Sequence, residues 1–423
     1  MGQSQQRLLL ICVLMLWICA SASKPVVAST NKNGVRTPQA HGTSALLRTP
    51  VCHSSKQVLE RNATSRGNQS MCSALCNDGT VPVYFARRKD PLKFIVWLQG
   101  GGFCDPGRSK VTGCPFHPCQ GPRWTSSWTS ETYDPTQHHQ GKFILRPDGP
   151  FAGWSKAFVV YCDGSSFLSN WTAPVTGVDG QGRANITYHL QGHQILLEAL
   201  NHLLLHRGMR HATDVIFGGT SAGGMATVHN CDIVGDYLTS VSPSLKRYAC
   251  LVDSGIFLDL PSHHSVVLPI LNAGERLGMR ACMHHLFNVH QSVALSQPSC
   301  NHSRLHECFM PQYRVAKIKY RYFVLQNMYD TWQEKMFGPI LCADLDRFTQ
   351  QVTAIFNPVT HPNGLFVLGC HSHSIPITAH QVVADRFFQW FAHQKVVHVL
   401  PPRDDRLCYD RKKGKQKPFC KKK

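Results

Sequence analysis

Acidic residues are scarce in this chain, which carries 25 Asp and Glu against 44 Lys and Arg, for a formal net charge of +19. A cationic surplus of this size favours association with anionic partners. Nucleic acid is excluded as that partner, because the sequence lacks a nucleic-acid recognition motif and its cysteines point to a compartment without nucleic acid. Internal repeats are also absent, so a solenoid or propeller architecture is not expected.

Long apolar runs are nearly absent as well. Residues 8–20 form one such run, with Arg7 before it and the small residues 21–23 after it. This pattern is typical of a cleaved signal peptide, which we place at residues 1–23. An uncleaved signal anchor is the alternative, but no second apolar run of spanning length follows. We therefore expect a protein that is secreted or lies in the lumen of the secretory pathway, with no transmembrane segment in the mature chain.

Cysteine, in contrast, is abundant, with 18 residues. Cys12 and Cys19 lie in the predicted signal peptide, and the even number that remains predicts disulfide bonds in an oxidising compartment. The run from Cys114 to Cys119 (CPFHPC) could suggest zinc, but a disulfide loop suits this compartment better. The sequence does not define the pairing. N-x-S/T sites that fit a glycosylated surface occur at Asn62, Asn68, Asn170, Asn185 and Asn301.

The two ends of the mature chain differ from its middle in composition. Residues 24–50 are rich in Ser, Thr, Asn, Gly and Pro and poor in apolar side chains, which predicts a disordered leader. Residues 411–423 hold eight Lys and Arg and no acid. Such a tail is either a solvated terminus or an electrostatic handle for an acidic polymer. We expect one folded domain over residues 51–400 and a basic tail at 401–423.

Short apolar runs alternate with a helical pattern between these ends. Strands are predicted at residues 93–98, 157–161, 215–217, 322–325 and 365–368, and a helix at residues 188–206. This alternation indicates an α/β fold, with a mostly parallel sheet and helices on both faces. The polar connections 105–154 and 260–320 hold many Cys, His and Pro residues. We interpret them as disulfide-stapled loop insertions on the face that carries the functional site.

The segment GGTSAGG (residues 218–224) is the most informative motif. It directly follows the apolar run 215–217 and sets Ser221 between close-set glycines. This pattern predicts a nucleophile elbow, in which the chain turns sharply at a serine between a strand and a helix. Glycines let neighbouring backbone approach closely in such a turn. The alternative is an ordinary glycine-rich turn that contains a serine.

A second glycine run, QGGGFC (residues 99–104), directly follows the predicted strand 93–98. Backbone N–H groups can converge on an oxyanion at such a run, because no side chain obstructs them. An ordinary flexible loop is the alternative. We predict that the amides of Gly101, Gly102 and Ala222, the residue after the serine, form an oxyanion hole.

A serine hydroxyl needs a base to accept its proton, and the base needs an acid to orient it. In an α/β-hydrolase-like fold the acid and then the histidine follow the serine in the chain, each at the C-terminal end of a later strand. Asp330 follows the predicted strand 322–325, and both His371 and His373 follow the predicted strand 365–368. This reasoning leaves both histidines open as the base.

Together these motifs resemble the pectin acetylesterase family, which includes Notum-like animal deacylases. The matching segments are LQGGGFC (98–104), YCDGSSF (161–167), GGTSAGG (218–224), HNCD (229–232), VDSG (252–255), YDTWQ (329–333) and CHSH (370–373). The resemblance implies an α/β-hydrolase-like serine carboxylesterase with Ser221 as nucleophile, Asp330 as orienting acid and His373 as base. It favours His373 because the family's histidine stands three residues after the cysteine that matches Cys370. It implies no metal and no cofactor.

Departures from the family pattern bear on the substrate. Gln99 replaces a usual acidic residue, and Phe103 stands where the plant members have tryptophan. The position of Gly102 carries tryptophan in the animal branch, so the loop resembles the plant type. Asp163 and Asp253 also match family positions, and we interpret them as structural. We predict hydrolysis of O-acyl esters, in particular O-acetyl esters, on a polysaccharide or glycoconjugate. The alternatives are Notum-like removal of a fatty acyl group from a protein, and non-catalytic glycan binding.

Overall fold

The computed structural model describes residues 47–50, 74–106, 116–119, 141–178, 182–259, 279–292, 305–334, 345–360 and 362–400. All of them belong to one compact unit that begins at Ala45. The predicted signal peptide, residues 24–46 of the leader, Cys114 and the basic tail lie outside the described residues, as do Asn62, Asn68 and Asn301. Within the described ranges, no helix combines the length and the apolar character needed to cross a membrane.

A nine-stranded sheet in the order β1-β2-β6-β3-β9-β10-β11-β12-β13 forms the centre of the unit. Its strands are β1 (Leu47–Pro50), β2 (Val83–Arg87), β3 (Asp90–Leu98), β6 (Trp154–Val159), β9 (Asp214–Thr220), β10 (Arg247–Asp253), β11 (Tyr322–Tyr329), β12 (Gly364–His371) and β13 (His398–Val399). Strand β2 pairs antiparallel with β1 and β6, and the remaining neighbours are parallel. The predicted mostly parallel sheet is confirmed.

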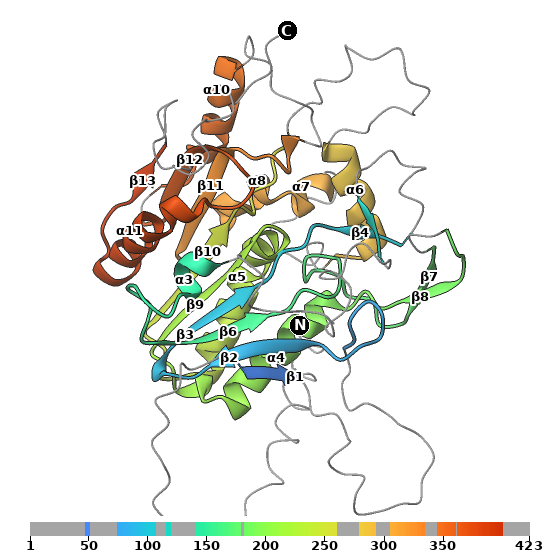
Figure 1. Cartoon of the computed structure of the whole chain (residues 1–423), viewed down its shortest axis with the longest axis horizontal. Helices are drawn as coiled ribbons and strands as arrows, with labels where there is room; N and C mark the ends of the chain where they lie inside the picture. Colours follow the sequence, from blue (N-terminus) through green and yellow to red (C-terminus); the bar gives the residue numbers. More distant parts are fainter. Residues whose placement is uncertain are drawn as a thin grey trace, which may run out of the picture. The chain divides into compact units, whose positions relative to one another are not determined.

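Side chains alternate between the two faces of this sheet, as strand geometry requires. In β3, Val96 packs into one apolar cluster and Trp97 into the other. The first cluster includes side chains of α4 (Gly192–His206), α5 (Ala222–Val241), α6 (Met279–His290), α7 (Leu305–Phe309) and α10 (Leu345–Phe356). The second includes side chains of α3 (Lys142–Leu145) and α11 (His380–His393). Helices therefore lie on both faces, as predicted (Figure 1).

Smaller elements decorate the connections between strands. They are β4 (Cys104–Asp105), β5 (His117–Pro118), β7 (Val175–Gly177), β8 (Ile186–Tyr188), α6 (Met279–His290), α7 (Leu305–Phe309) and α8 (Pro311–Arg314), with single turns at Met209–His211, Val315–Lys317 and Ile377–Ala379. Helix α6 comes from the connection 260–320, and its His290 binds the carbonyl of Cys104 through Nε2 at 2.7 Å. The described part of this insertion therefore reaches the glycine loop that follows β3.

The structure differs from the predictions at several elements. Residues 47–50, which the sequence placed in the disordered leader, form β1 and pair with β2. Helix α4 begins at Gly192 instead of residue 188, because Tyr188 pairs with Val175 in the β7–β8 hairpin. Strand β10 was not predicted, although its burial is complete from Ala249 onward.

Disulfide bonds join Cys76 to Cys162, Cys104 to Cys119 and Cys231 to Cys250. Cys282, Cys308 and Cys370 are disulfide-bonded as well. The disulfide-stapled character of the chain is therefore confirmed. The partner of Cys119 is Cys104, so its sulfur is not available as the thiolate ligand that a zinc site needs.

Candidate active site

Ser221 occupies the sharp turn between β9 and α5. Its backbone has φ 58° and ψ −120°, a conformation that is strained for a residue with a side chain. The flanking glycines permit this turn, because a Cβ at Gly223 would overlap the carbonyl of Leu98, and one at Gly219 would lie 2.8 Å from that same carbonyl oxygen. The segment therefore has the geometry of the predicted nucleophile elbow.

Two hydrogen bonds connect Ser221 to an acid through one histidine. The Nε2 atom of His373 lies 2.8 Å from Oγ of Ser221. The Nδ1 atom of the same ring lies 2.9 and 2.8 Å from the two carboxylate oxygens of Asp330. Asp330 directly follows β11, and His373 lies two residues beyond β12. The structure thus brings together the three residues that the sequence predicted, from three separate strand ends.

Hydrogen bonds from neighbouring residues hold the Asp330 carboxylate in a fixed orientation. It accepts hydrogen bonds from the backbone amides of Trp332 at 2.8 Å and Gln333 at 3.2 Å. The side-chain amide of Gln326 donates to it at 3.1 Å. With only 3% of Asp330 exposed, these donors replace the water that an ionised carboxylate would otherwise bind. Sequence reasoning missed Gln326 and Gln333, although their spacing from Asp330 along a strand and turn was a usable signal.

His371, the other candidate base, has a different partner. Its Nε2 atom lies 2.8 Å from Oε2 of Glu334. Glu334 and Asp330 belong to one turn, in which the Glu334 amide donates to the Asp330 carbonyl at 3.0 Å. A second histidine–carboxylate pair therefore lies beside the first, and it does not include Ser221.

The glycine loop after β3 packs directly against the elbow. A Cβ at Gly100 would overlap the carbonyl of Thr220 and lie 2.7 Å from Cβ of Ser221, so only glycine fits there. Gly101 follows in the chain, and Gly102 has φ 76°, in the region that favours glycine. Ala222 is the first residue of α5, where a backbone amide has no acceptor within its own helix.

Aromatic rings fill the space behind this loop. Phe103, which is 1% exposed, meets Phe116, Phe257 and Trp332 at centroid distances of 6.2, 5.5 and 5.8 Å. The Trp332 ring also lies 6.0 Å from the ring of His373. Centroid separations in this range correspond to direct ring contact. The cluster of these four aromatic residues therefore forms a packed apolar wall next to the candidate base.

Two further buried acids, Asp253 and Asp163, form hydrogen bonds with groups other than a histidine. The Asp253 carboxylate accepts hydrogen bonds from the hydroxyls of Thr220 at 2.8 Å and Ser254 at 2.9 Å. Its backbone carbonyl accepts the amide of Ser221 at 2.8 Å. Burial raises its pKa to about 6, against these hydrogen bonds. Burial likewise raises the pKa of Asp163 to about 6.

Comparison with known proteins agrees with this geometry. The pectinacetylesterase family model matches residues 54–360. Pectin acetylesterase 5 of Arabidopsis thaliana is 27% identical over 375 residues, covering 77% of this chain and 79% of that protein. The palmitoleoyl-protein carboxylesterase notum2 of Xenopus laevis is 32% identical over 197 residues, covering 45% of this chain and 36% of that protein.

A solved structure shares the fold. The crystal structure of the Wnt deacylase Notum from Drosophila aligns with a TM-score of 0.62 and 19% identity, covering 86% of this chain and 100% of that one. The family model matches more than half of the chain. The chain belongs to the pectinacetylesterase family of carboxylic ester hydrolases.

Proposed function

We propose that this protein is a secreted serine carboxylesterase that removes O-acetyl groups from a polysaccharide or glycoconjugate. Ser221 is the nucleophile, His373 the general base and Asp330 the acid that orients it. The observation that carries this proposal is the continuous chain of hydrogen bonds from Ser221 Oγ through the His373 ring to the Asp330 carboxylate. That arrangement has the roles and distances of a serine hydrolase triad.

The reaction proceeds in two halves through an acyl-enzyme. Ser221 Oγ attacks the ester carbonyl carbon while Nε2 of His373 accepts its proton. The tetrahedral intermediate then collapses, the C–O bond to the sugar breaks, and His373 returns the proton to the departing alcohol. A water molecule repeats the sequence on the acyl-enzyme and releases acetate. Asp330 keeps the proton of His373 on Nδ1, so that Nε2 faces the serine as an acceptor.

The oxyanion hole of this reaction is formed by the amides of Gly101, Gly102 and Ala222. The contact between Gly100 and Ser221 places the glycine loop beside the nucleophile. The amide of Ala222 also benefits from the N-terminus of α5, where the helix dipole favours negative charge. Fixed donors of this kind stabilise the charge that develops on the carbonyl oxygen.

A short acyl group is favoured by the aromatic wall. Phe103, Phe257 and Trp332 contact one another at 5.1 to 5.8 Å between centroids, so a long chain cannot pass between them without separating the rings. Acetate needs no such opening. The plant relatives, named as pectin acetylesterases, agree with this preference.

Removal of a longer acyl chain is the second candidate function. The same rings supply an apolar lining once separated, and Trp332 is only half-buried. The Notum relatives, named as palmitoleoyl-protein carboxylesterases, agree with this reading. The length of the acyl chain is therefore the property that separates the two candidates.

Secretion is supported by the disulfide bonds and by the exposure of Asn170 and Asn185, two of the N-x-S/T sites. We also propose that the basic tail at 401–423 raises affinity for an acidic polymer. Attraction of this type is screened by salt, so it should be lost at high ionic strength.

The decisive experiment measures hydrolysis of p-nitrophenyl esters from acetate to palmitate by the wild type, Ser221→Ala and Ser240→Ala. Ser240 lies on α5, the helix that begins directly after Ser221, but it is exposed and its hydroxyl donates to the carbonyl of Tyr237, so it is a matched control. We expect acetate to be the preferred ester and Ser221→Ala alone to be inactive. A preference for palmitate would favour the deacylase, and equal activity in Ser221→Ala would refute the proposed nucleophile.

A further inference from the structure

The glycine loop (residues 99–104) is hydrogen-bonded at several points to a segment that contains no member of the proposed triad. We call residues 161–169 the clamp segment. Its Tyr161 amide donates to Oε1 of Gln99 at 2.9 Å, at the start of the loop. Its Gly164 carbonyl accepts the amide of Cys104 at 2.8 Å, at the end of the loop. Between these two anchors, the Tyr161 hydroxyl donates to the carbonyl of Gly102 at 2.8 Å.

The direction of the Tyr161 hydrogen bond is fixed by its surroundings. The amide of Ser166 lies 2.7 Å from Oη of Tyr161, and an amide N–H can only donate. The single hydroxyl proton is therefore committed to the Gly102 carbonyl. Tyr161 is fully buried, and burial raises its pKa well above the usual value for tyrosine, so this donor persists across the working pH range.

Ser166 ties the same segment to the elbow. Its hydroxyl donates to the carbonyl of Ala222, the residue that follows the nucleophile. One residue thus binds Tyr161 through its amide and the first turn of α5 through its side chain. The two halves of the proposed oxyanion hole, the glycine loop and Ala222, are linked through Tyr161 and Ser166.

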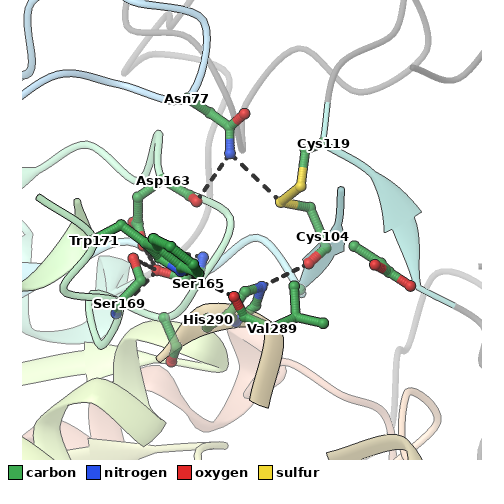
Figure 2. The surroundings of a disulfide bond; sticks show 12 residues. Asn77, Cys104, Cys119, Asp163, Ser165, Ser169, Trp171, Val289 and His290 are labelled. Atoms are coloured by element: carbon green, nitrogen blue, oxygen red, sulfur yellow. Dashed lines mark hydrogen bonds between the residues drawn. A yellow bond between two sulfur atoms is a disulfide. The ribbon is translucent and has the colours of Figure 1, made fainter. Parts of the chain in front are cut away.

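The clamp segment is itself held rigidly. Ser166 and Phe167 have φ of 61° and 52°, a conformation that persists only when neighbouring contacts enforce it. The buried Asp163 carboxylate supplies such contacts by accepting the amides of Ser165 at 3.0 Å and Phe167 at 3.2 Å. Figure 2 shows Asn77 bridging the carbonyl of Asp163 and the Cys104–Cys119 disulfide, at 3.2 Å and 3.5 Å.

We propose that Tyr161 and Ser166 are positioning residues that set the oxyanion hole, an inference that rests on the proposed function. Three consecutive glycines, 100–102, have little steric resistance to rotation of their peptide planes. A loop of this kind holds its amides in place when the peptide units beside them are fixed. The hydroxyl of Tyr161 fixes the Gly102–Phe103 peptide, which is joined to the Gly102 amide through one Cα. The hydroxyl of Ser166 fixes the Ala222–Gly223 peptide, which is joined to the Ala222 amide in the same way. These contacts act on transition-state charge and leave substrate binding largely unchanged.

The test compares Tyr161→Phe with Tyr248→Phe on p-nitrophenyl acetate. Both substitutions remove one hydroxyl that donates to a backbone carbonyl, since Tyr248 donates to Cys231 at 2.9 Å, away from the glycine loop. For Tyr161→Phe we expect kcat to fall by at least about tenfold with KM within about twofold, as for a weakened oxyanion hole. Inhibition by a small alkylboronic acid, which forms a tetrahedral adduct with the serine, should weaken by a similar factor. Tyr248→Phe should change neither quantity.

A wild-type kcat in folded Tyr161→Phe, with only a lower melting temperature, would overturn the inference. If Tyr161→Phe does not fold, Ser166→Ala removes the contact with Ala222 alone and carries the same kinetic test and the same boronate measurement. Wild type and Ser221→Ala are assayed in parallel. Activity retained in Ser221→Ala would reject the proposed function itself, whereas inactive Ser221→Ala beside fully active Tyr161→Phe and Ser166→Ala would reject the clamp alone.

Discussion

Two histidine–carboxylate pairs lie side by side at the carboxyl edge of the sheet, and they differ in what they reach. Asp330 and Glu334 belong to one turn after β11, and His373 and His371 lie two residues apart at the end of β12. The histidine-to-acid distance is 2.8 Å in both pairs. Only His373 extends the chain of hydrogen bonds to Ser221. Residue type and spacing therefore do not distinguish the proposed catalytic pair from its neighbour, whereas the contact of the second ring nitrogen with Ser221 does.

The pairs also differ in their surroundings. The Asp330 side chain is 3% exposed and bound by backbone amides, whereas that of Glu334 is 21% exposed. A buried carboxylate with all its hydrogen bonds made holds its histidine in one orientation. At an exposed carboxylate, water competes with the histidine for the same oxygens. We therefore expect substitutions in the Asp330–His373 pair to have large effects on activity, and substitutions in the Glu334–His371 pair to have small effects on stability.

Removal of each imidazole in turn should have the largest effect. His373→Ala should lower kcat/KM by about 10⁴-fold or more, because Ser221 loses its proposed base. His371→Ala should keep activity within a few-fold of wild type. Steady-state kinetics on p-nitrophenyl acetate decides, and the reverse pattern would move the base to His371.

Replacing the two acids by their amides is the next largest effect. Asp330→Asn should lower kcat by about 10²- to 10⁴-fold, because the amide no longer fixes the tautomer that presents Nε2 to the serine. Glu334→Gln should leave kcat nearly unchanged. The pH profile of kcat for both variants is the measurement, and comparable losses in the two would show that the pairs act as one unit.

Asp253 differs from both acids, since the hydroxyls of Thr220 and Ser254 hold its carboxylate in place of a histidine. Its pKa in the folded protein, about 6, lies above the usual value of 3.8, so the folded state binds this proton more tightly. The resulting stability is present below pH 4 and is lost as pH rises through 6. Asp253→Asn should remove this slope, worth about 1–3 kcal/mol. Denaturant unfolding between pH 4 and 7 tests it, and an unchanged slope would contradict it.

The smallest expected effect is on the stability that the Glu334–His371 pair supplies. Partly exposed ion pairs contribute about 0–1 kcal/mol and weaken with salt. Glu334→Gln should therefore lower the free energy of unfolding by less than about 1 kcal/mol. Chemical denaturation at low and high salt measures this, with wild type alongside. A loss of several kcal/mol would show that Glu334 is as tightly integrated as Asp330.

Much of the candidate site could be predicted because each residue lies within two residues of the C-terminal end of an apolar strand. Ser221 and Asp330 needed only that rule and the glycines. The choice between His371 and His373 needed the family resemblance, since both follow the same strand and their directions depend on the local turn. Strand β10 was missed because it begins with exposed Arg247 and half-buried Tyr248, which hide its apolar centre. The contacts of Tyr161 could not be predicted, because they join segments about 60 residues apart.

Two disulfide bonds lie beside the clamp segment. Cys76–Cys162 closes on the start of that segment, and Cys104–Cys119 closes on the end of the glycine loop. A newly made chain whose thiols are still reduced would lack both disulfide bonds while its sheet could already form. Esterase activity should then mature with oxidation, later than secondary structure, which circular dichroism and p-nitrophenyl acetate hydrolysis during oxidative refolding would reveal. Such an enzyme would be inactive during synthesis and would gain its activity only after its disulfide bonds have formed.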